Sequence, residues 1–278
     1  MGLKKELFSG LVFLLFAGIA VALWFALDNI FYLFNFLYIG FFVALGIYLM
    51  LSKRKYARNV ALLGVGLYML VFLGLIEGEN MQLAGFWFYL FNGVFMAATI
   101  HYFVAKIAGP FLFGRGWCGY ACWTAMVLDL LPFKVPRQKR KKRLGFIRYL
   151  VFASTFLFVL ALFVFRVQNI EWIMYVSFIA GNLLYYAVGI ALAFAFKDNR
   201  AFCKYVCPIT VFLKPASYFS LLRVKVNHEK CIGCGKCEQV CPMNVEVTNN
   251  SRRTRKYGTE CILCLECAKN CPKDAIKF

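Results

Sequence analysis

Histidine is almost absent from this chain of 278 residues. The only two histidines are His101 and His228. A haem held inside the membrane by two histidines is therefore not expected, because the second axial ligand is missing. The chain also contains no C-x2-C-H motif, so covalent attachment of a c-type haem is not indicated.

Acidic residues are scarce as well. The chain has 13 Asp and Glu residues against 32 Lys and Arg residues, a formal net charge of +19 and a hydrophobic content of 62%. A soluble protein of this length would not be both so apolar and so basic. Apolar blocks of about twenty residues, long enough to cross a bilayer, fill most of the first two thirds of the sequence. We therefore predict a membrane protein.

These apolar blocks predict six transmembrane helices, near residues 7–27, 30–51, 59–76, 83–105, 146–168 and 172–196. The first block is too long for the apolar region of a signal peptide and lacks a clear cleavage site, so we expect it to remain as a membrane helix.

The basic residues predict the topology. In the six-helix arrangement, 31 of the 32 Lys and Arg residues fall on one side and only Arg166 lies toward the other, where Asp28, Glu77, Glu79 and Glu171 collect. The positive-inside rule then places both termini in the cytoplasm of a multi-pass inner-membrane protein. The flanking membrane helices explain the basic runs, so we expect no nucleic-acid partner.

Eight cysteines near the C-terminal end follow one spacing rule, C-x2-C-x2-C-x3-C-P, written twice. This is the spacing of bacterial ferredoxins with two [4Fe-4S] clusters, in which the fourth cysteine of each run reaches the other cluster. One cluster should therefore use Cys231, Cys234, Cys237 and Cys271. The other should use Cys261, Cys264, Cys267 and Cys241.

Zinc knuckles or a disulfide framework are the alternatives for these eight cysteines. Zinc needs only four ligands per site and has no use for the third cysteine spacing or for the proline. Disulfides are rare in a reducing compartment, which is where the predicted topology places this tail. We therefore prefer two iron–sulfur clusters.

The predicted fold class is an α-helical polytopic membrane protein of about six transmembrane helices, with a C-terminal α+β ferredoxin domain of the bacterial 2[4Fe-4S] type. Residues 1–200 should form the membrane domain, 201–222 an interface segment with an amphipathic connector at the membrane surface, and 223–278 the ferredoxin domain. Within it we expect strands at Arg223–Val226, Val245–Val247 and Ala275–Phe278, short helices near Gly235–Val240 and Leu265–Asn270, and a polar loop at Asn249–Lys256.

Four further cysteines form two C-x3-C pairs, Cys118 with Cys122 and Cys203 with Cys207. Residues four apart share one face of a helix, and each pair follows a predicted membrane helix at the cytoplasmic surface. Together they supply four thiolates, enough for a third cluster at the interface. A redox-active or metal-binding dithiol and simple buried thiols remain alternative interpretations.

Three stretches together resemble a known family. They are Gly114-Arg-Gly-Trp-Cys118-Gly-Tyr-Ala-Cys122, Cys203-Lys-Tyr-Val-Cys207-Pro208 and the doubled ferredoxin run. They are similar to membrane ferredoxin-type proteins of the NapH kind, which accompany periplasmic nitrate reductases. Relatives of that family serve nitrous-oxide reduction and copper assembly of cytochrome oxidase. The resemblance covers about residues 100 to 278 and departs from the family at Trp123, where proline is usual, and by two additional helices.

The resemblance implies an electron-transfer subunit of a quinone-linked oxidoreductase, with a redox partner protein. A quinone or quinol site needs an apolar pocket with a polar residue that exchanges protons. His101, beside Tyr102 and near Lys106, is our candidate contact. Arg115, Trp117 and Tyr120 are expected near the same place, although Arg115 also suits lipid head groups.

Two functions of different classes follow. In the first, the protein passes electrons between quinone and a redox partner through its clusters. In the second, it is a metal reductase or assembly factor whose C-x3-C thiols receive copper, a soft ion that thiolates bind well. The first predicts a cluster on all four interface cysteines, and the second predicts reversible copper binding there.

Overall fold

The computed structural model describes residues 5–277 except 53, 55, 96 and 250–254. Its helices are α1 (Lys5–Leu27), α2 (Ile30–Leu51), α3 (Ala57–Leu67), η1 (Tyr68–Ile76), α4 (Leu83–Phe91), α5 (Ala97–His101), η2 (Tyr102–Ala108), α6 (Gly109–Phe113), α7 (Gly116–Tyr120), α8 (Trp123–Leu128), η3 (Lys142–Phe146), α9 (Ile147–Val164), α10 (Ile170–Phe196), α11 (Ala201–Tyr205), α12 (Thr210–Tyr218), α13 (Lys236–Gln239), η4 (Arg255–Gly258) and α14 (Glu266–Lys269). The strands are β1 (Lys225–Val226) and β2 (Ile276–Lys277).

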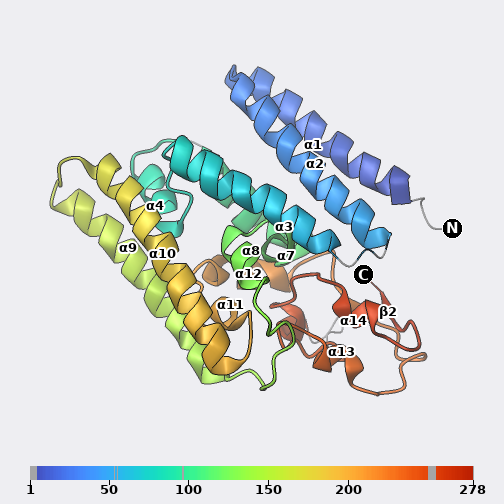
Figure 1. The fold of residues 1–278 in the computed structure, drawn as a ribbon. Coiled ribbons are helices and arrows are strands. Elements are labelled where there is room, and N and C mark those ends of the chain that lie inside the picture. Colours follow the sequence, from blue (N-terminus) through green and yellow to red (C-terminus); the bar gives the residue numbers. More distant parts are fainter. Residues whose placement is uncertain (1–4, 53, 55, 96, 250–254, 278) are drawn as a thin grey trace.

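Four of the long helices form two antiparallel pairs, with the helix of α3 and η1 and several short helices between them. Figure 1 shows α1 and α2 on one side, α9 and α10 on the other, and the ferredoxin unit at one end. The turn between α1 and α2 is fixed by Asn29, whose side chain accepts a hydrogen bond of 2.9 Å from the Phe31 amide. Such an N-cap satisfies a backbone donor that would otherwise be unpaired at the start of the helix.

Among the described residues, five helices are long and apolar enough to cross a membrane: Lys5–Leu27, Ile30–Leu51, Ala57–Ile76, Lys142–Val164 and Ile170–Phe196. Each consists of at least 20 residues, the length that spans the hydrocarbon core. The predicted class, a helical polytopic protein with a C-terminal ferredoxin-type unit, is confirmed.

The fourth predicted block, 83–105, is not one continuous helix. It breaks at Asn92 and Gly93, where Gly93 has φ of +66°, a conformation that glycine adopts without a steric penalty. A second apolar helix, Ala98–Phe113, follows and leads into the Cys118–Cys122 loop. Its start is held by the carboxylate of Glu79, which accepts a hydrogen bond of 2.9 Å from the Ala98 amide.

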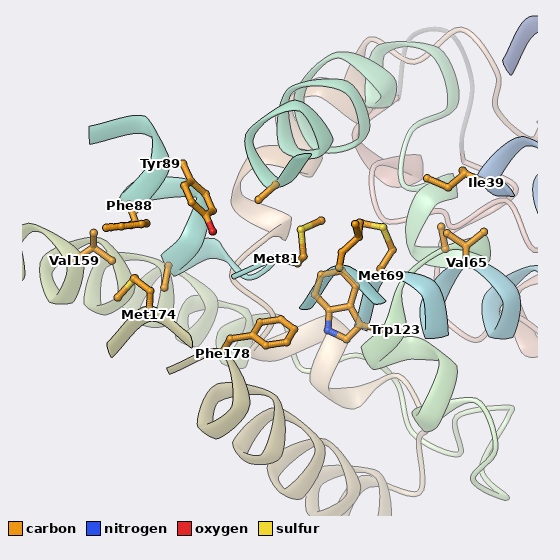
Figure 2. Close-up of a cluster of buried hydrophobic side chains, with 14 residues drawn as sticks. Ile39, Val65, Met69, Met81, Phe88, Tyr89, Trp123, Val159, Met174 and Phe178 are labelled. Atoms are coloured by element: carbon orange, nitrogen blue, oxygen red, sulfur yellow. The ribbon is translucent and has the colours of Figure 1, made fainter. Parts of the chain in front are cut away.

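The main core lies between the two helix pairs. Figure 2 shows the buried side chains that compose it: Ile39, Val65, Met69, Met81, Phe88, Tyr89, Trp123, Val159, Met174 and Phe178. Hydrogen bonds also cross this region, among them one from Trp123 Nε1 to Asn182 Oδ1 at 2.8 Å. Lipid is as apolar as these side chains, so close packing and such interhelical bonds hold the helices together. Trp123, the departure from the resembled family, thus joins α8 to α10.

The ferredoxin unit is closed by a short antiparallel ladder, in which Lys225 pairs with Lys277 and Val226 with Ile276. The expected strand at 245–247 is wrong. Val245 and Val247 are buried but pair with no strand in the described part of the chain, because they pack into the core of the unit instead. Most of the expected loop at 249–256, residues 250–254, lies outside the described residues.

The connector between the membrane helices and this unit contains helix α12. Helix α12 packs with one face against α6, η2, α9 and η4, and its position at the membrane surface stays a prediction. Its buried face consists of Thr210, Leu213, Ala216 and Ser217. The small side chains on this face allow the close approach of the neighbouring helices.

Candidate iron-sulfur sites and a neighbouring cavity

The second ferredoxin run lines a cavity together with one cysteine of the first. Cys241, Cys261, Cys264 and Cys267 all face this cavity, whose other walls are mainly apolar. Burial raises the pKa of the Cys261 thiol to about 12. These four sulfurs are the set that the spacing rule assigns to one cluster, and an apolar cavity ringed by four thiols suits a [4Fe-4S] cluster.

The first run lines the second cavity in the same way. Its sulfurs are Cys231, Cys234, Cys237 and Cys271, again the set expected from the crossed pattern. In both runs the fourth cysteine accepts a backbone hydrogen bond from the residue four positions later: Val245 N to Cys241 Sγ at 3.4 Å and Ala275 N to Cys271 Sγ at 3.3 Å. Hydrogen bonds to sulfur are among the factors that set cluster potentials.

The two C-x3-C pairs meet at the base of the membrane domain. Burial, together with electrostatic repulsion from Cys203, Cys118 and Cys122, raises the pKa of Cys207 to about 12. This mutual influence requires the four thiols to be close neighbours. In the described residues, however, no three Cys, His, Asp or Glu side chains are close enough to hold a single ion. The same is true of the eight ferredoxin cysteines, which suit a cluster larger than one ion.

Each pair straddles the end of a helix instead of sharing one helix face, which corrects the sequence-based expectation. Cys118 lies in α7, which ends at Tyr120, and Cys122 is extended with φ of −85° and ψ of 120°. Cys203 lies in α11, which ends before Cys207. The break turns the second sulfur of each pair away from the helix that holds the first.

The two C-x3-C segments are copies of one longer motif, R-x2-C-x-Y-x-C. The copies begin at Arg115 and Arg200, and each arginine reaches into the other copy. Arg200 Nη1 donates to the Cys118 carbonyl at 3.0 Å, and Arg115 Nη2 donates to the Cys203 carbonyl at 3.4 Å. This exchange brings the two cysteine pairs together. These contacts between the two copies were not predicted from the cysteine spacings, although the Arg and Tyr that both copies share were a signal of the repeat.

A buried carboxylate holds each arginine in place. Asp129 accepts two hydrogen bonds from Arg200, from Nε at 2.7 Å and from Nη2 at 2.6 Å, and one from Arg58. Burial alone would raise the pKa of the Asp129 carboxyl, but the two guanidinium groups lower it below its usual range. The carboxylate is therefore charged at neutral pH and keeps Arg200 beside Cys118.

Glu260, directly before Cys261, gathers three arginines from the membrane domain. Arg140 and Arg148 donate to Oε1 at 2.7 and 3.1 Å, and Arg115 donates to Oε2. Arg115 is fully buried in this contact, so the alternative role as an anchor for lipid head groups is wrong. The cluster of charges fastens the second ferredoxin run to the membrane domain.

The Cys118–Cys122 loop also touches that run directly. The Tyr120 hydroxyl donates to the Leu263 carbonyl at 2.8 Å. Gly119 lies so close to Ile262 that a Cβ added at Gly119 would meet the Ile262 carbonyl oxygen at 2.3 Å. The loop between the interface cysteines therefore abuts the loop between Cys261 and Cys264. Tyr120 therefore contacts the second ferredoxin run, and it does not line the cavity beside His101, where the sequence predicted it.

A third cavity, of about 100 Å³, lies among α1, α2, η1 and α5–η2. Its walls are mostly apolar, with polar contributions from Tyr32, Asn35, His101 and Trp117. Asn35 Oδ1, His101 Nε2 and Trp117 Nε1 are buried and have no hydrogen-bond partner among the described residues. Unpaired buried polar atoms are rare in proteins and call for an explanation such as a bound ligand.

Trp117 connects this cavity to the interface cysteines. Its ring packs edge-on against the His101 ring, with the two ring centroids 4.9 Å apart. The ammonium group of the buried Lys106 lies 5.2 Å from the centroid of the same Trp117 ring. Cys118 follows directly in the chain. The structure therefore places His101 and Trp117 together, as expected, and adds Asn35 from α2, which the sequence analysis missed because no local pattern marks it.

Comparisons with known proteins agree with the cysteine motifs. A family model described as "4Fe-4S dicluster domain" matches residues 230–276. Another, described as "4Fe-4S binding domain", matches 95–143 and 181–227, two segments that each contain one C-x3-C pair. No solved structure matches the chain.

Several curated proteins are similar to this chain. An uncharacterized protein of Methanocaldococcus jannaschii is 28% identical over 215 residues, 73% of this chain and 80% of that protein. The "Putative electron transport protein YccM" of Escherichia coli is 29% identical over 92 residues, 33% of this chain and 25% of that protein. The "Methylamine utilization ferredoxin-type protein MauN" of Paracoccus denitrificans is 40% identical over 48 residues, 17% of each chain.

Together these findings identify an iron–sulfur electron-transfer protein with ferredoxin-type domains. It carries two [4Fe-4S] clusters, and its long apolar helices make it a multi-pass membrane protein.

Proposed function

We propose that the protein passes electrons between the quinone pool of the inner membrane and a cytoplasmic redox partner, as the resemblance to the NapH kind implies. We assign Cys231, Cys234, Cys237 and Cys271 to one ferredoxin cluster and Cys261, Cys264, Cys267 and Cys241 to the other. Cys118, Cys122, Cys203 and Cys207 hold a third cluster. Bound in these sites, iron–sulfur clusters supply one-electron transfer.

One observation carries this proposal: the segment Trp117–Tyr120 touches both the membrane cavity and the ferredoxin unit. Trp117 lines the cavity, while Gly119 and Tyr120 contact Ile262 and Leu263. The interface cysteines thus lie between an apolar pocket and the buried ferredoxin cavity. A site in this position serves to connect the two.

The cavity suits the head group of a quinone. It is enclosed by apolar side chains from α1, α2 and η1, and its unpaired polar atoms are both donors and acceptors. Trp117 Nε1–H can donate to a quinone carbonyl, and Asn35 Oδ1 can accept from a quinol hydroxyl. His101 is the titratable group beside them and would exchange the proton. The additional helices α1 and α2 supply one wall of this pocket.

The domain assignment follows the same division: residues 1–200 as the membrane domain, 201–222 as the interface segment and 223–278 as the ferredoxin domain. The basic residues support a cytoplasmic position for the ferredoxin domain and both termini.

The decisive test is the iron and acid-labile sulfide content of protein purified without oxygen. We expect about twelve irons per chain, falling to about eight in the Cys118/Cys122/Cys203/Cys207→Ser variant. A matched variant, Cys231/Cys234/Cys237/Cys271→Ser, should also lose about four. About eight irons in both the native protein and the first variant would disprove the third cluster. Reversible copper binding at these thiols would then favour the metal-reductase alternative.

The quinone contact is tested separately. His101→Ala and Asn35→Ala should each weaken binding of a soluble quinone analogue at least tenfold, since each removes a buried polar partner. Asn92→Ala is the control, because the Asn92 amide bonds only the Phe88 carbonyl of its own helix among the described residues. Unchanged analogue binding in both cavity variants would place the quinone elsewhere.

A further inference from the structure

The first ferredoxin run opens to solvent, whereas the second is enclosed. Of the twelve cysteines, only Cys234 is exposed. Ile232, between Cys231 and Cys234, is 61% exposed, while Ile262 at the same position of the second run is 2% exposed. Electron exchange with a soluble protein therefore has its shortest route through the first run.

The two runs also differ in charge at matched positions. The residue before the first cysteine is Lys230 in one run and Glu260 in the other. The residue before the third cysteine is Lys236 in the first run and Glu266 in the second. At the crossing cysteines, Lys273 follows Cys271-Pro272 and lines the cavity of the first run, whereas Met243 follows Cys241-Pro242 and lines the cavity of the second. The cysteines assigned to the exposed cluster are thus accompanied by a lysine at three positions where those of the enclosed cluster have a carboxylate or an apolar side chain.

Each of the three lysines is near the exposed Ile232, either along the chain or in the lining of the same cavity. Lys230, Lys236 and Lys273 are exposed, and Lys236 and Lys273 line the cavity of the first run. Within the described ranges none of the three forms an ion pair. Two exposed carboxylates, Glu229 and Asp274, lie nearby and leave the lysines in excess.

We propose that this face, formed by Lys230, Ile232, Cys234, Lys236 and Lys273, is the docking surface for an acidic soluble electron carrier. An exposed apolar centre with a charged rim is the common composition of a transient interface. Unpaired lysines around it attract an acidic partner and accelerate the encounter. The inference rests on the proposed electron-transfer function, because it names the chemistry of the partner.

The test measures binding of a defined probe, an acidic flavodoxin, to the full chain in nanodiscs of zwitterionic lipid. The variant Lys230/Lys236/Lys273→Glu reverses the charge of the face. We expect its dissociation constant at low ionic strength to rise at least tenfold, and the native affinity to fall as salt screens the attraction. The control Lys134/Lys139/Lys142→Glu carries the same change in net charge at three other exposed lysines and should change affinity less than threefold.

Three outcomes would overturn the inference. The first is equal weakening by both triple variants, which would indicate only the net charge of the protein. The second is unaltered binding in the face variant. The third is that the face variant no longer binds vesicles that contain phosphatidylserine but still binds flavodoxin. This result would mean that the face docks on a membrane.

Failure of this inference is distinguishable from failure of the proposed function. The iron content of the face variant should equal that of the native protein, since none of the three lysines is a ligand. Lys236 and Lys273 line the cavity of the exposed cluster, so reduction by a soluble quinol is followed at the enclosed cluster, whose cavity none of the three lines, and should also equal that of the native protein. Loss of flavodoxin binding with these two properties intact supports the docking surface alone.

Discussion

The two ferredoxin runs obey one spacing rule but lie in opposite environments, and the difference shows what each run does. At two matched positions the backbone adopts positive φ in both: Gly233 and Gly235 at +69°, Leu263 at +54° and Leu265 at +59°. Glycine adopts this conformation freely, whereas a residue with a Cβ loses roughly 1–2 kcal/mol. At these positions the first run has glycines, whose backbone is unstrained, whereas the second run has leucines, whose backbone is strained.

The strain in the second run is offset by docking. Leu265 is buried in the core shared with Cys118 and Phe202, and the Leu263 side chain approaches Gly116. A glycine at these positions would have no side chain with which to fill the contact. The second run is therefore built to hold the membrane domain, and the first to remain accessible.

The largest difference between the two runs is expected when the fourth cysteine of either run is replaced by serine. Cys241→Ser should remove or convert the cluster beside the membrane domain, and Cys271→Ser the exposed one, because each cysteine lines the cavity of the other run. Electron paramagnetic resonance of the reduced protein would tell the two apart.

Function should separate the same two variants. In Cys241→Ser, reduction of the exposed cluster by a soluble quinol should slow at least tenfold, because its neighbour on the membrane side is altered. In Cys271→Ser, reduction of the enclosed cluster should continue. Loss of the exposed signal in Cys241→Ser, with the enclosed signal intact, would contradict the crossed assignment.

The next largest effect concerns Glu260. Glu260→Gln removes the charge that three buried or half-buried arginines share, and an unpaired buried charge costs about 3–5 kcal/mol. We expect a lower thermal midpoint and faster hydrogen exchange at residues 260–268. Glu266→Gln is the matched control in the same run: its exposed pair with Lys269 is worth at most about 1 kcal/mol. Equal midpoints of the two variants would show that the arginines do not fasten the run.

Motif spacing predicted much of the fold and of the site, because cluster ligands must be arranged at fixed intervals. The eight ferredoxin cysteines and the class of the fold followed from such local rules, whereas the helices that α12 contacts did not. The buried face of α12, which consists of Thr210, Leu213, Ala216 and Ser217, does not indicate which helices it contacts, because that depends on the tertiary structure. The break at Asn92–Gly93 carried a signal in Gly93, yet the surrounding apolar residues hid the end of the helix.

The cavity and the contacts of Arg115 and Arg200 with the opposite copy of the motif could not be predicted from the sequence for another reason. Asn35 and His101 come from helices far apart in the chain, and no periodic pattern links them. The buried partners Asp129 and Glu260 resemble ordinary surface carboxylates in the sequence. What distinguishes them is the arginines that surround them, which requires the three-dimensional arrangement.

A smaller effect tests the close approach of the Cys118–Cys122 loop. Gly119→Ala places a Cβ against the Ile262 carbonyl and should push the enclosed run away. We expect a loss of about 1–3 kcal/mol of stability, the usual result of overpacking, and more rapid exchange of the Leu263 amide. Gly10→Ala is the control, since a Cβ there meets nothing within 4 Å. If both variants unfold at one temperature, the contact is looser than described.

The smallest effect is expected where strain and packing oppose each other. Leu263→Gly relieves roughly 1–2 kcal/mol of backbone strain but loses the contact with Gly116 and about 0.5–1 kcal/mol through the greater freedom of the unfolded chain. These contributions nearly cancel, so the thermal midpoint should move little. Docking should still weaken, because only the folded interface loses the leucine, and limited proteolysis would detect release of the ferredoxin unit. A clear rise in stability with proteolysis unchanged would mean that the leucine serves no docking role, and the contrast with Gly233 would then reflect strain alone.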